Sequence, residues 1–586
     1  MIKLLKNLKP YRLSIMGVIV FVFLQSLSEL YLPTLMSDIV DTGVVNGDVN
    51  YIIRIGGWMI LIAVIAMISS LLGSYLAAKA ATGFGRDLRT KVFTKVESFS
   101  LEEFDEKGTA SLIVRTTNDI TQIQQLAVTM LRMFLRAPLL FIGGIIMAVL
   151  KDAKLSLVLV VILPILTIII LLIAKKSMSL FKSMQIKLDK LNLVLREYLT
   201  GIRVIRAFNR EVYEKKRFHK ANLDLTETAK KVNILMAILI PLMMLILNLT
   251  IVAIIWFGSI RINNGGMQVG DLMAFIQYTS QIMFSLIMVS MMFILVPRAS
   301  VSAIRINEVL DVEPKIKDPM IPKESKLEIE NGITSEKDKR GYLEFDEVSF
   351  CYQGAEEPAI KKISFRTNPG ELTAIIGSTG SGKSTLINLI PRFYDVTAGR
   401  ILVDGVDVRE LTQEKLRAKI GLVPQKAILF TGTIAENISF GNNNLSRDEI
   451  IRAAEIAQAS EFISTMEQVY DSQIAQGGTN ISGGEKQRLA IARALAKHPE
   501  IYIFDDSFSA LDFKTEAKLR AAIKKETKNE TVLIIAQRVT TVMNADQIIV
   551  LDEGKIVGMG KHQDLIRTCK VYREIVASQL SEEELT

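Results

Sequence analysis

The chemistry-bearing pattern of this chain lies in residues 371–385, ELTAIIGSTGSGKST. An apolar stretch predicts a strand, a glycine-rich turn follows it, and a helix is expected to begin after the turn. The spacing G-x-x-x-x-G-K-[ST] is met by Gly377, Gly382, Lys383 and Ser384. Glycines allow the backbone to curl so that its N–H groups point inward, where they can hold phosphate oxygens. A strand before the turn and a helix after it favour this interpretation over a glycine turn that binds no nucleotide.

Two side chains of this loop have specific chemistry. Lys383 can reach the β- and γ-phosphates of ATP, and the Ser384 hydroxyl can ligate Mg²⁺. The N-terminus of the following helix adds partial positive charge. The expected nucleotide-binding residues are Gly377, Ser378, Thr379, Gly380, Ser381, Gly382, Lys383, Ser384 and Thr385.

Other positions could complete such a site. Tyr352 lies ahead of the loop, where an aromatic ring could stack on adenine. Gln425, in GLVPQ, can reach Mg²⁺ or the attacking water. An apolar strand, IYIFDD, ends in Asp505 and Asp506.

The size and composition of the chain indicate more than a nucleotide-binding domain. Its 586 residues are too many for one core. Hydrophobic residues make up 49% and are concentrated in the first 300 residues. The formal net charge of +8 does not favour a nucleic-acid partner, because Lys and Arg cluster beside apolar runs, as on the cytoplasmic side of membrane proteins. Two cysteines predict no disulfide framework, and no cleavable signal pattern is expected.

Six apolar stretches are long enough to span a bilayer. They are expected at 13–36, 55–78, 133–150, 155–174, 234–260 and 272–296. Lys3, Lys6, Lys9 and Arg12 precede the first stretch, whereas residues 31–53 contain no Lys or Arg. This bias places the N-terminus in the cytoplasm, and six spans return the chain to the side where an ATP site must lie.

Two long charged connections, 79–132 and 175–231, are predicted as helical arms with tips near 108–119 and 201–214. They could carry force to a distant cytoplasmic domain; solvated hairpins without a mechanical role are the alternative. A polar linker, 312–341, precedes a region of alternating strands and helices. Strands are expected at 343–352, 372–376, 400–403, 420–423, 501–504, 531–536 and 547–551, which predicts a mixed α/β fold.

Polar side chains within the spans are candidates for the transport pathway, because intramembrane ionisable groups are functional by default. They are Gln25, Glu29, Arg132, Arg136, Asn248, Gln277, Tyr278 and Gln281. Methionines are abundant near the fifth and sixth spans: Met243, Met244, Met283, Met288, Met291 and Met292. Flexible thioethers suit an adaptable cavity, but ordinary helix packing is the favoured interpretation for most of them.

Further motifs follow in the order of one family. ISGGEKQR occupies 481–488, IYIFDD follows it, SALD stands at 509–512 and AQRVTTV begins at Ala536. With the six spans and two arms, the whole chain resembles one half of an ATP-binding cassette (ABC) exporter. The resemblance implies a six-helix all-α transmembrane domain (1–311), a linker (312–341) and an α/β ABC nucleotide-binding domain (342–586).

The resemblance also implies two halves that sandwich two ATP molecules. Each ATP is held by one chain's phosphate loop and the other chain's signature, and closure turns the membrane cavity outward. In this chain the signature residues for the partner's ATP are Ser482, Gly483, Gly484 and Glu485. The implied Mg²⁺ ligands are Ser384, Gln425 and Asp505.

The sequence departs from the family pattern at several positions. Asp506 stands where the family has a general-base glutamate, and Gln537 replaces the switch histidine. The shorter side chain withdraws the carboxylate by about 1.5 Å, and a glutamine cannot carry the proton, so slow hydrolysis is expected here. Ile481, Glu485 and Gln476 also differ from the usual leucine, glutamine and glutamate, but the amide donors of the signature remain.

Two faults in one site predict a different partner half that carries the glutamate and the histidine, as in heterodimeric bacterial multidrug exporters. An active homodimer that tolerates both substitutions is the alternative. The expected function is ATP-driven export of hydrophobic or amphipathic compounds, of the multidrug type, across the cytoplasmic membrane. A dedicated lipid or peptide exporter and a nucleotide-gated channel remain open, whereas six spans exclude a soluble ABC ATPase.

Overall fold

The computed structural model describes residues 1–323, 340–442 and 444–579. The chain divides into two compact units, Met1–Ser98 with Lys107–Val312 and Phe99–Glu106 with Glu313–Thr586. Most of the predicted linker, 324–339, lies outside the described residues.

Long helices build the first unit. They are α2 (Arg12–Asp38), α3 (Val49–Glu97), α7 (Leu135–Lys151), α8 (Leu157–Thr200), α10 (Glu211–Asn263) and α11 (Val269–Leu310). The run from Thr109 to Lys151 is continuous and comprises α5 (Thr109–Val114), η3 (Arg115–Asp119), α6 (Ile120–Thr129), η4 (Met130–Phe134) and α7. Six helical segments among the described residues are long and apolar enough to cross a membrane, which confirms the six predicted spans.

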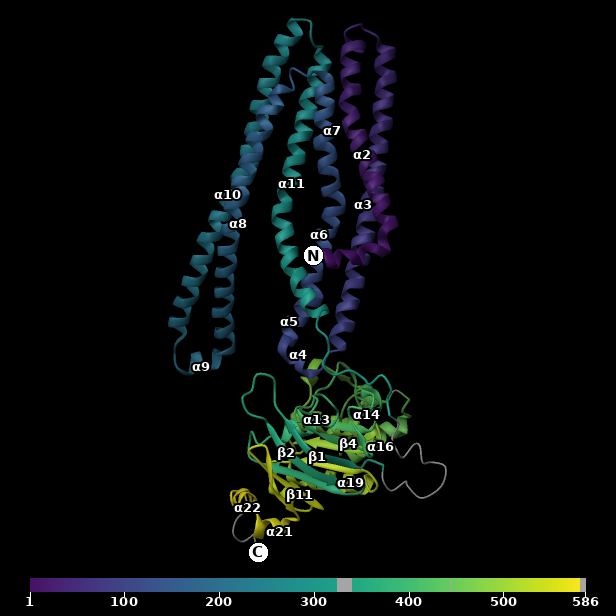
Figure 1. Cartoon of the computed structure of the whole chain (residues 1–586), viewed down its shortest axis with the longest axis vertical. Coiled ribbons are helices and arrows are strands. Elements are labelled where there is room, and N and C mark those ends of the chain that lie inside the picture. The colour runs from purple at the N-terminus through teal and green to yellow at the C-terminus, as the bar shows by residue number, and fades with distance from the viewer. Residues whose placement is uncertain (324–339, 443, 580–586) are drawn as a thin grey trace. The chain divides into compact units, whose positions relative to one another are not determined.

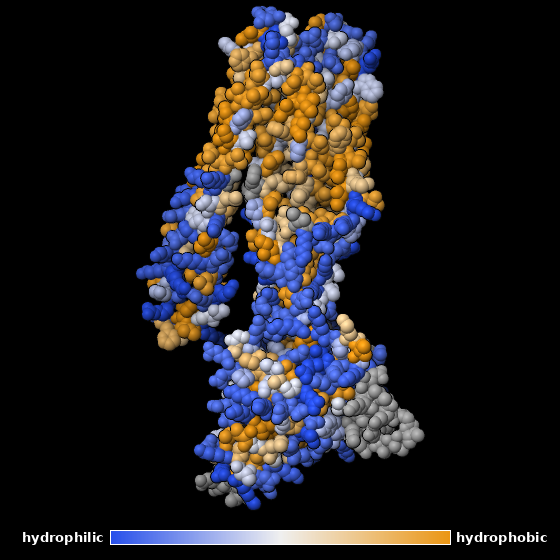
Figure 2. Space-filling view, in the orientation of Figure 1, coloured by the Kyte–Doolittle hydropathy of each residue, from blue (hydrophilic) through white to orange (hydrophobic). Residues whose placement is uncertain are grey.

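The helices of this unit change character along their length. Hydrophobic side chains cover their upper parts, and hydrophilic side chains cover the lower parts of α8 and α10 (Figure 2). Trp58, Leu171 and Trp256 are among the large apolar residues left exposed, which fits contact with lipid tails rather than water.

The arms extend the spans as continuous helices. The second arm reverses at α9 (Ile202–Ala207), within the predicted range, and Figure 1 shows α8 and α10 side by side down to this turn. The predicted tip of the first arm is wrong. Helix α3 ends at Glu97, α4 (Leu101–Lys107) lies in the turn, and residues 109–119 already form the returning helix. Gly108, at φ 72, ends the turn because the left-handed region suits glycine.

The second unit is an α/β domain with two main sheets. The first has the order β12-β11-β3-β10-β9-β6, parallel except for the antiparallel edge strand β12. Its strands are β3 (Leu372–Gly377), β6 (Ile420–Val423), β9 (Ile501–Asp505), β10 (Thr531–Ile535), β11 (Gln547–Asp552) and β12 (Lys555–Gly560). The antiparallel sheet β2-β1-β4-β5 comprises β1 (Leu343–Phe350), β2 (Ile360–Thr367), β4 (Ala398–Val403) and β5 (Val406–Asp407). All seven predicted strands are present, whereas the prediction missed β2, β5 and β12, as well as the two-residue pair β7 (Gly432–Thr433) and β8 (Gln473–Ile474).

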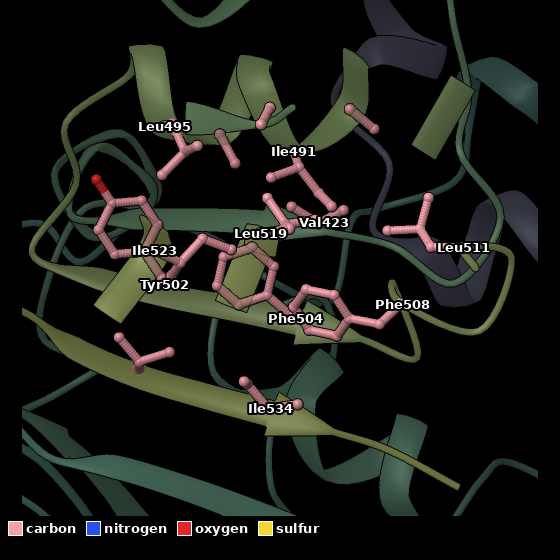
Figure 3. Packing of buried hydrophobic residues seen from close by; sticks show 14 of the residues in the cluster. Val423, Ile491, Leu495, Tyr502, Phe504, Phe508, Leu511, Leu519, Ile523 and Ile534 are labelled. Atoms are coloured by element: carbon pink, nitrogen blue, oxygen red, sulfur yellow. The ribbon is translucent and has the colours of Figure 1, made fainter. Parts of the chain in front are cut away.

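Helices pack against the parallel sheet or against α18 (Gly483–Ala496), which lies on it. They include α13 (Lys383–Leu389), α14 (Gln413–Ala418), α15 (Ile434–Ile438), α16 (Arg447–Ile456), α17 (Ser460–Ser464), α19 (Phe513–Glu526), α20 (Val539–Val542), α21 (His562–Thr568) and α22 (Lys570–Ala577). Figure 3 shows Tyr502 and Phe504 of β9 between Ile491 of α18 and Ile534 of β10. All five residues of β9 are buried, as expected for a strand that is covered on both faces of the sheet. This packing holds β9, and with it Asp505, in a defined position.

Candidate active site

The phosphate loop joins the central strand β3 to α13. β3 pairs in parallel with β10 and β11, which holds the start of the loop at the carboxyl end of the sheet. Gly380 and Gly382 have φ values of 84° and 100°. A Cβ on Gly382 would lie 2.8 Å from Ile360 Cδ1 and 2.9 Å from the Ala359 carbonyl oxygen, so only glycine fits. These residues therefore form the tight cradle that a nucleotide phosphate chain requires.

The amino group of Lys383 lies over this loop. Its Nζ donates hydrogen bonds to the carbonyl oxygens of Gly377 at 2.9 Å and Ser378 at 2.7 Å. Burial lowers the pKa of Lys383, and the negative charges of Asp505 and Asp506 oppose that shift. The loop thus positions one cation between its own carbonyls and two buried carboxyl groups.

Asp505 ends β9, and Asp506 follows it directly. Burial and the neighbouring Asp506 raise the pKa of Asp505 to about 6, while Lys383 and a hydrogen bond from Ser384 oppose the rise. Burial also raises the pKa of Asp506. The predicted metal-ligating pair, Ser384 and Asp505, is therefore in contact, and a hydroxyl with a carboxylate suits Mg²⁺.

Two other predicted site residues, Gln425 and Gln537, bond to Asp506. Gln425 Nε2 donates to Asp506 Oδ2 at 3.3 Å, and Gln537 Nε2 donates to the same oxygen at 2.9 Å. The Asp506 backbone turns at φ 47, and its N–H bonds to the Ile535 carbonyl at 2.9 Å. Aspartate tolerates this left-handed conformation better than most residues. Gln425 is thus bonded to Asp506, and its part in holding Mg²⁺ stays a prediction.

Tyr352 lies at the edge of the loop. Its hydroxyl is 3.0 Å from Thr385 Oγ1, and its ring meets Phe350 and Tyr394 edge-on. The residue is 39% exposed, so part of its surface remains accessible to a base. The structure joins Tyr352 to the phosphate loop, and stacking on adenine stays a prediction.

The signature forms the N-terminus of α18. Ser482 is its N-cap, and Ser482 and Glu485 cap each other: the Glu485 carboxylate accepts from the Ser482 N–H at 2.7 Å and from its hydroxyl at 2.8 Å. A Cβ on Gly483 would meet no atom within 4 Å, whereas one on Gly484 would lie 3.2 Å from the Ala510 carbonyl oxygen. The first turn is therefore open at Gly483, while the carboxylate of Glu485 is already engaged.

The structure brings together four of the predicted pathway residues in the helical unit. Arg136 Nη2 donates to Glu29 Oε1 at 2.7 Å and Oε2 at 2.8 Å. Gln25 Nε2 donates to Glu29 Oε1 at 3.0 Å, and Gln281 Nε2 donates to the Glu29 carbonyl at 3.0 Å. This group links α2, α7 and α11.

A cavity of 260 Å³ adjoins this group. Its polar lining comprises Gln25, Ser70, Ser74, Thr129, Arg132 and Arg136. Among the methionines, Met288 lines the cavity, whereas Met243 and Met283 pack in a buried cluster, as ordinary helix packing predicts.

The remaining pathway candidates lie elsewhere. Tyr278 is fully buried, with its hydroxyl 2.7 Å from Thr34 Oγ1, so it joins α11 to α2. Asn248 and Gln277 are exposed and do not line this cavity. Polarity alone did not separate them from the cavity residues, because it does not report which way a helix face points.

Sequence reasoning missed one residue next to the site. The side chain of Gln579 bonds to the backbone before and after Arg538, at Gln537 and at Val539. No motif marks this residue, and it lies 42 positions away along the chain, so no signal in the sequence identified it.

Comparisons with known proteins agree with this architecture. Residues 15–286 match the family described as ABC transporter transmembrane region, and residues 360–509 match the family described as ABC transporter. An uncharacterised ABC transporter ATP-binding protein of Mycobacterium tuberculosis is 41% identical over 98% of this chain and 97% of its own. An ATP-dependent lipid A-core flippase of Chromobacterium violaceum is 31% identical over 95% and 93%. A bacterial Atm1-family ABC exporter with ATP bound has a TM-score of 0.80 and 27% identity, covering 97% and 99%.

The chain belongs to the ABC transporter family, in the class of exporters whose transmembrane and ATP-binding domains are fused. It is a multi-pass membrane protein with a C-terminal ATP-binding domain of the ATP-hydrolysing transporter type.

Proposed function

We propose that this chain is one half of a heterodimeric ABC exporter that moves hydrophobic or amphipathic compounds, of the multidrug type, across the cytoplasmic membrane. Its own nucleotide site hydrolyses ATP slowly. Its signature, at Ser482, Gly483 and Gly484, completes the hydrolysing site of a different partner half.

One observation carries the proposal: Asp506 Oδ2 already accepts hydrogen bonds from two side-chain amides, Gln425 and Gln537. A general base must accept a proton from water within hydrogen-bond reach. Two donors on the same oxygen reduce its capacity to do so, and the side chain is also about 1.5 Å shorter than glutamate. At the switch position a neutral amide donates but takes up no proton. The site therefore still binds ATP, whereas proton transfer from water to Asp506 is weakened.

The chain's own residues hold the nucleotide. The glycine cradle and the amino group of Lys383 bind the phosphates, and Ser384, Asp505 and Gln425 would hold Mg²⁺. When bound, the metal neutralises charge that develops on the phosphates. Tyr352 offers its ring to the base. The weak step is acceptance of a proton at Asp506, so ATP remains at this site for long periods.

Restoring the family residues tests this proposal. We expect Asp506→Glu with Gln537→His to raise the ATPase rate of the complex, with this chain's own site turning over at least about tenfold faster, because a positioned base contributes on the order of 10²–10⁴-fold. The measurement is steady-state ATP hydrolysis in lipid nanodiscs, on the complex that a tag on this chain purifies. Asp506→Asn serves as the matched control and should stay at the unmodified rate. An unchanged rate in the restored variant would contradict the proposal.

Lipid export is the second candidate, and the cavity beside Arg132 and Arg136 favours it. The Arg132 guanidinium lines this cavity and suits an acidic head group, whereas that of Arg136 is paired with Glu29. Exposed apolar helix faces suit acyl chains. A relative that is 31% identical carries the name lipid A-core flippase.

Stimulation by lipid distinguishes this candidate. If a lipid is carried, anionic phospholipid should raise ATPase activity above the level in zwitterionic phospholipid, and Arg132→Gln should remove most of that difference. Lys216→Gln, which removes a charge from an exposed position of α10, is the control and should keep the response. Equal activity of Arg132→Gln and the unmodified chain in both lipids would exclude the lipid candidate.

A further inference from the structure

The segment that carries the switch position is held by the C-terminal helix. Gln579 Nε2 donates to the Gln537 carbonyl oxygen at 2.7 Å, and the Val539 N–H donates to Gln579 Oε1 at 2.8 Å. One amide therefore spans Arg538 and fixes the backbone before and after it. Both hydrogen bonds lie within the second compact unit, which contains the nucleotide-binding domain.

The second of these bonds satisfies a helix terminus. Helix α20 begins at Val539, and its N-cap residue, Arg538, makes no side-chain capping bond. The first N–H groups of a helix lack partners within the helix. Gln579 supplies one of these partners from a distant part of the chain, so the start of α20 depends on where Gln579 lies.

Packing of α22 determines that position. Tyr572 and Val576, both fully buried, face the core of the nucleotide-binding domain. The Tyr572 hydroxyl is 2.7 Å from His562 Nδ1 of α21. Gln579 lies two residues beyond the end of α22. Its N–H donates to the Val576 carbonyl oxygen at 3.0 Å, so the helical turn continues to this residue. The face that anchors α22 is thus also the face that presents Gln579.

A second contact holds the same segment from α19. Arg538 lies over the Phe513 ring at 5.1 Å, and its Nη1 is 3.5 Å from the carboxylate of the buried Glu516. Thr541 donates to that carboxylate at 2.7 Å. The side chain of Gln537, between these anchors, donates to Asp506 Oδ2 at 2.9 Å.

We infer that Gln579 is a positioning residue of the ATP site: it fixes the backbone at position 537 and so places the side chain of that residue on Asp506. This inference rests on the proposed role of position 537. Its consequence is that the end of α22, remote from the phosphate loop in sequence, controls the switch position.

The test uses the restored background, Asp506→Glu with Gln537→His, in the complex purified through this chain. The two backbone groups that Gln579 contacts persist there, so Gln579 should position the introduced histidine as well. Gln579→Met keeps the length of the side chain but removes both hydrogen bonds. We expect it to lower the turnover that the restoration added by about tenfold, because misplacement of a catalytic group by 1 Å can cost about a hundredfold. The KM for ATP should change little, since the bonds of Gln579 go to the switch segment.

A matched pair of truncations separates this residue from the chain beyond it. A stop after Gln579 should retain the added turnover, and a stop after Ser578 should lose it. Equal activity of the two truncations would overturn the inference. A Gln579→Met variant with unchanged kcat, or with kcat and ATP affinity lowered together through general loss of structure, would also overturn it.

Amide hydrogen exchange keeps this test independent of the proposed function. In the unmodified background, Gln579→Met should speed exchange in residues 538–542 and leave β9 and α18 unchanged. If the restoration adds no turnover, the proposed slow site is wrong. Amide exchange then still tests whether Gln579 holds residues 538–542, independently of turnover. Unchanged exchange at 538–542 would overturn the inference in either background.

Discussion

At the scale of single residues, the proposed function combines intact phosphate binding with an impaired base. Lys383 bonds to the carbonyl oxygens of the loop, and Ser384 bonds to Asp505 at the end of β9. Asp506 and Gln537, which depart from the family pattern, contact each other rather than two separate parts of the site. Under the proposed function, both substitutions weaken proton acceptance and leave the phosphate-binding residues in place.

Lys383→Ala tests the binding part of the site. Removing this cation should weaken ATP binding to this chain by about ten- to a hundredfold, since hydrogen bonds to charged groups contribute roughly 1.5–3 kcal/mol. Equilibrium binding of a fluorescent ATP analogue to the complex measures the change. Lys518→Ala removes the same charge from an exposed position of α19 and should have no effect. Affinity retained in Lys383→Ala would argue against the assignment of the phosphate loop.

At the scale of elements, the signature lies at the N-terminus of α18, on a different element from the phosphate loop and from β9. Its first turn is closed by the reciprocal bonds of Ser482 and Glu485, and Gly483 is open to an incoming group. Glutamate in place of the usual glutamine does not disable the turn, because its carboxylate caps the helix instead of projecting outward.

Ser482→Arg should therefore stop turnover although this chain's own phosphate loop is intact. The change removes the cap, at a cost of about 1 kcal/mol to the helix. It also places a large side chain where phosphate oxygens of the partner's ATP are expected. We expect ATP hydrolysis by the complex to fall at least about a hundredfold, the effect of losing one preorganised donor. Ser482→Thr keeps the hydroxyl and should remain active. Normal turnover in Ser482→Arg would mean that this signature serves no hydrolysing site.

At the scale of the whole molecule, the helical unit exposes apolar surface that lipid does not account for. The lower parts of α8 and α10 are hydrophilic (Figure 2), yet Leu199, Val204, Phe208 and Val212 near α9 are more than half exposed. Apolar side chains gathered at the end of a polar arm mark an interaction surface. The second half that the proposed function requires would supply a chain to cover it.

The composition of the purified complex tests whether the second chain is different. We expect a tag on this chain to recover a second ABC half at equal amounts, because a pair of identical chains would contain two slow sites. The chain purified alone in lipid should hydrolyse ATP at about a tenth of the rate of the mixture or less. Robust hydrolysis by this chain alone, abolished by Asp506→Asn, would establish an active homodimer. Ion current without hydrolysis would instead indicate a channel.

The class of this protein follows from local patterns in its amino-acid sequence. Six apolar stretches, the loop from Gly377 to Ser384 and the ISGGE motif are local patterns, and their physical meaning depends on neighbours in the chain. Length and hydropathy decide whether a helix can span a bilayer, and glycine spacing decides whether a backbone can surround a phosphate. The spans and the predicted strands were therefore correct, while edge strands such as β2 and β12, with many exposed residues, were missed.

The contacts between residues far apart in the chain become visible in the folded molecule alone. Glu29 pairs with Arg136 across 107 positions, while Gln277 is exposed and lies outside this group, although polarity marks all three equally. The bond of Gln537 to Asp506, and the hold of Gln579 on Gln537, depend on how β9, β10 and α22 pack. Such contacts arise when buried faces of separate elements fit together. Their free energy comes from the packed core as a whole, so no local pattern in the chain records them.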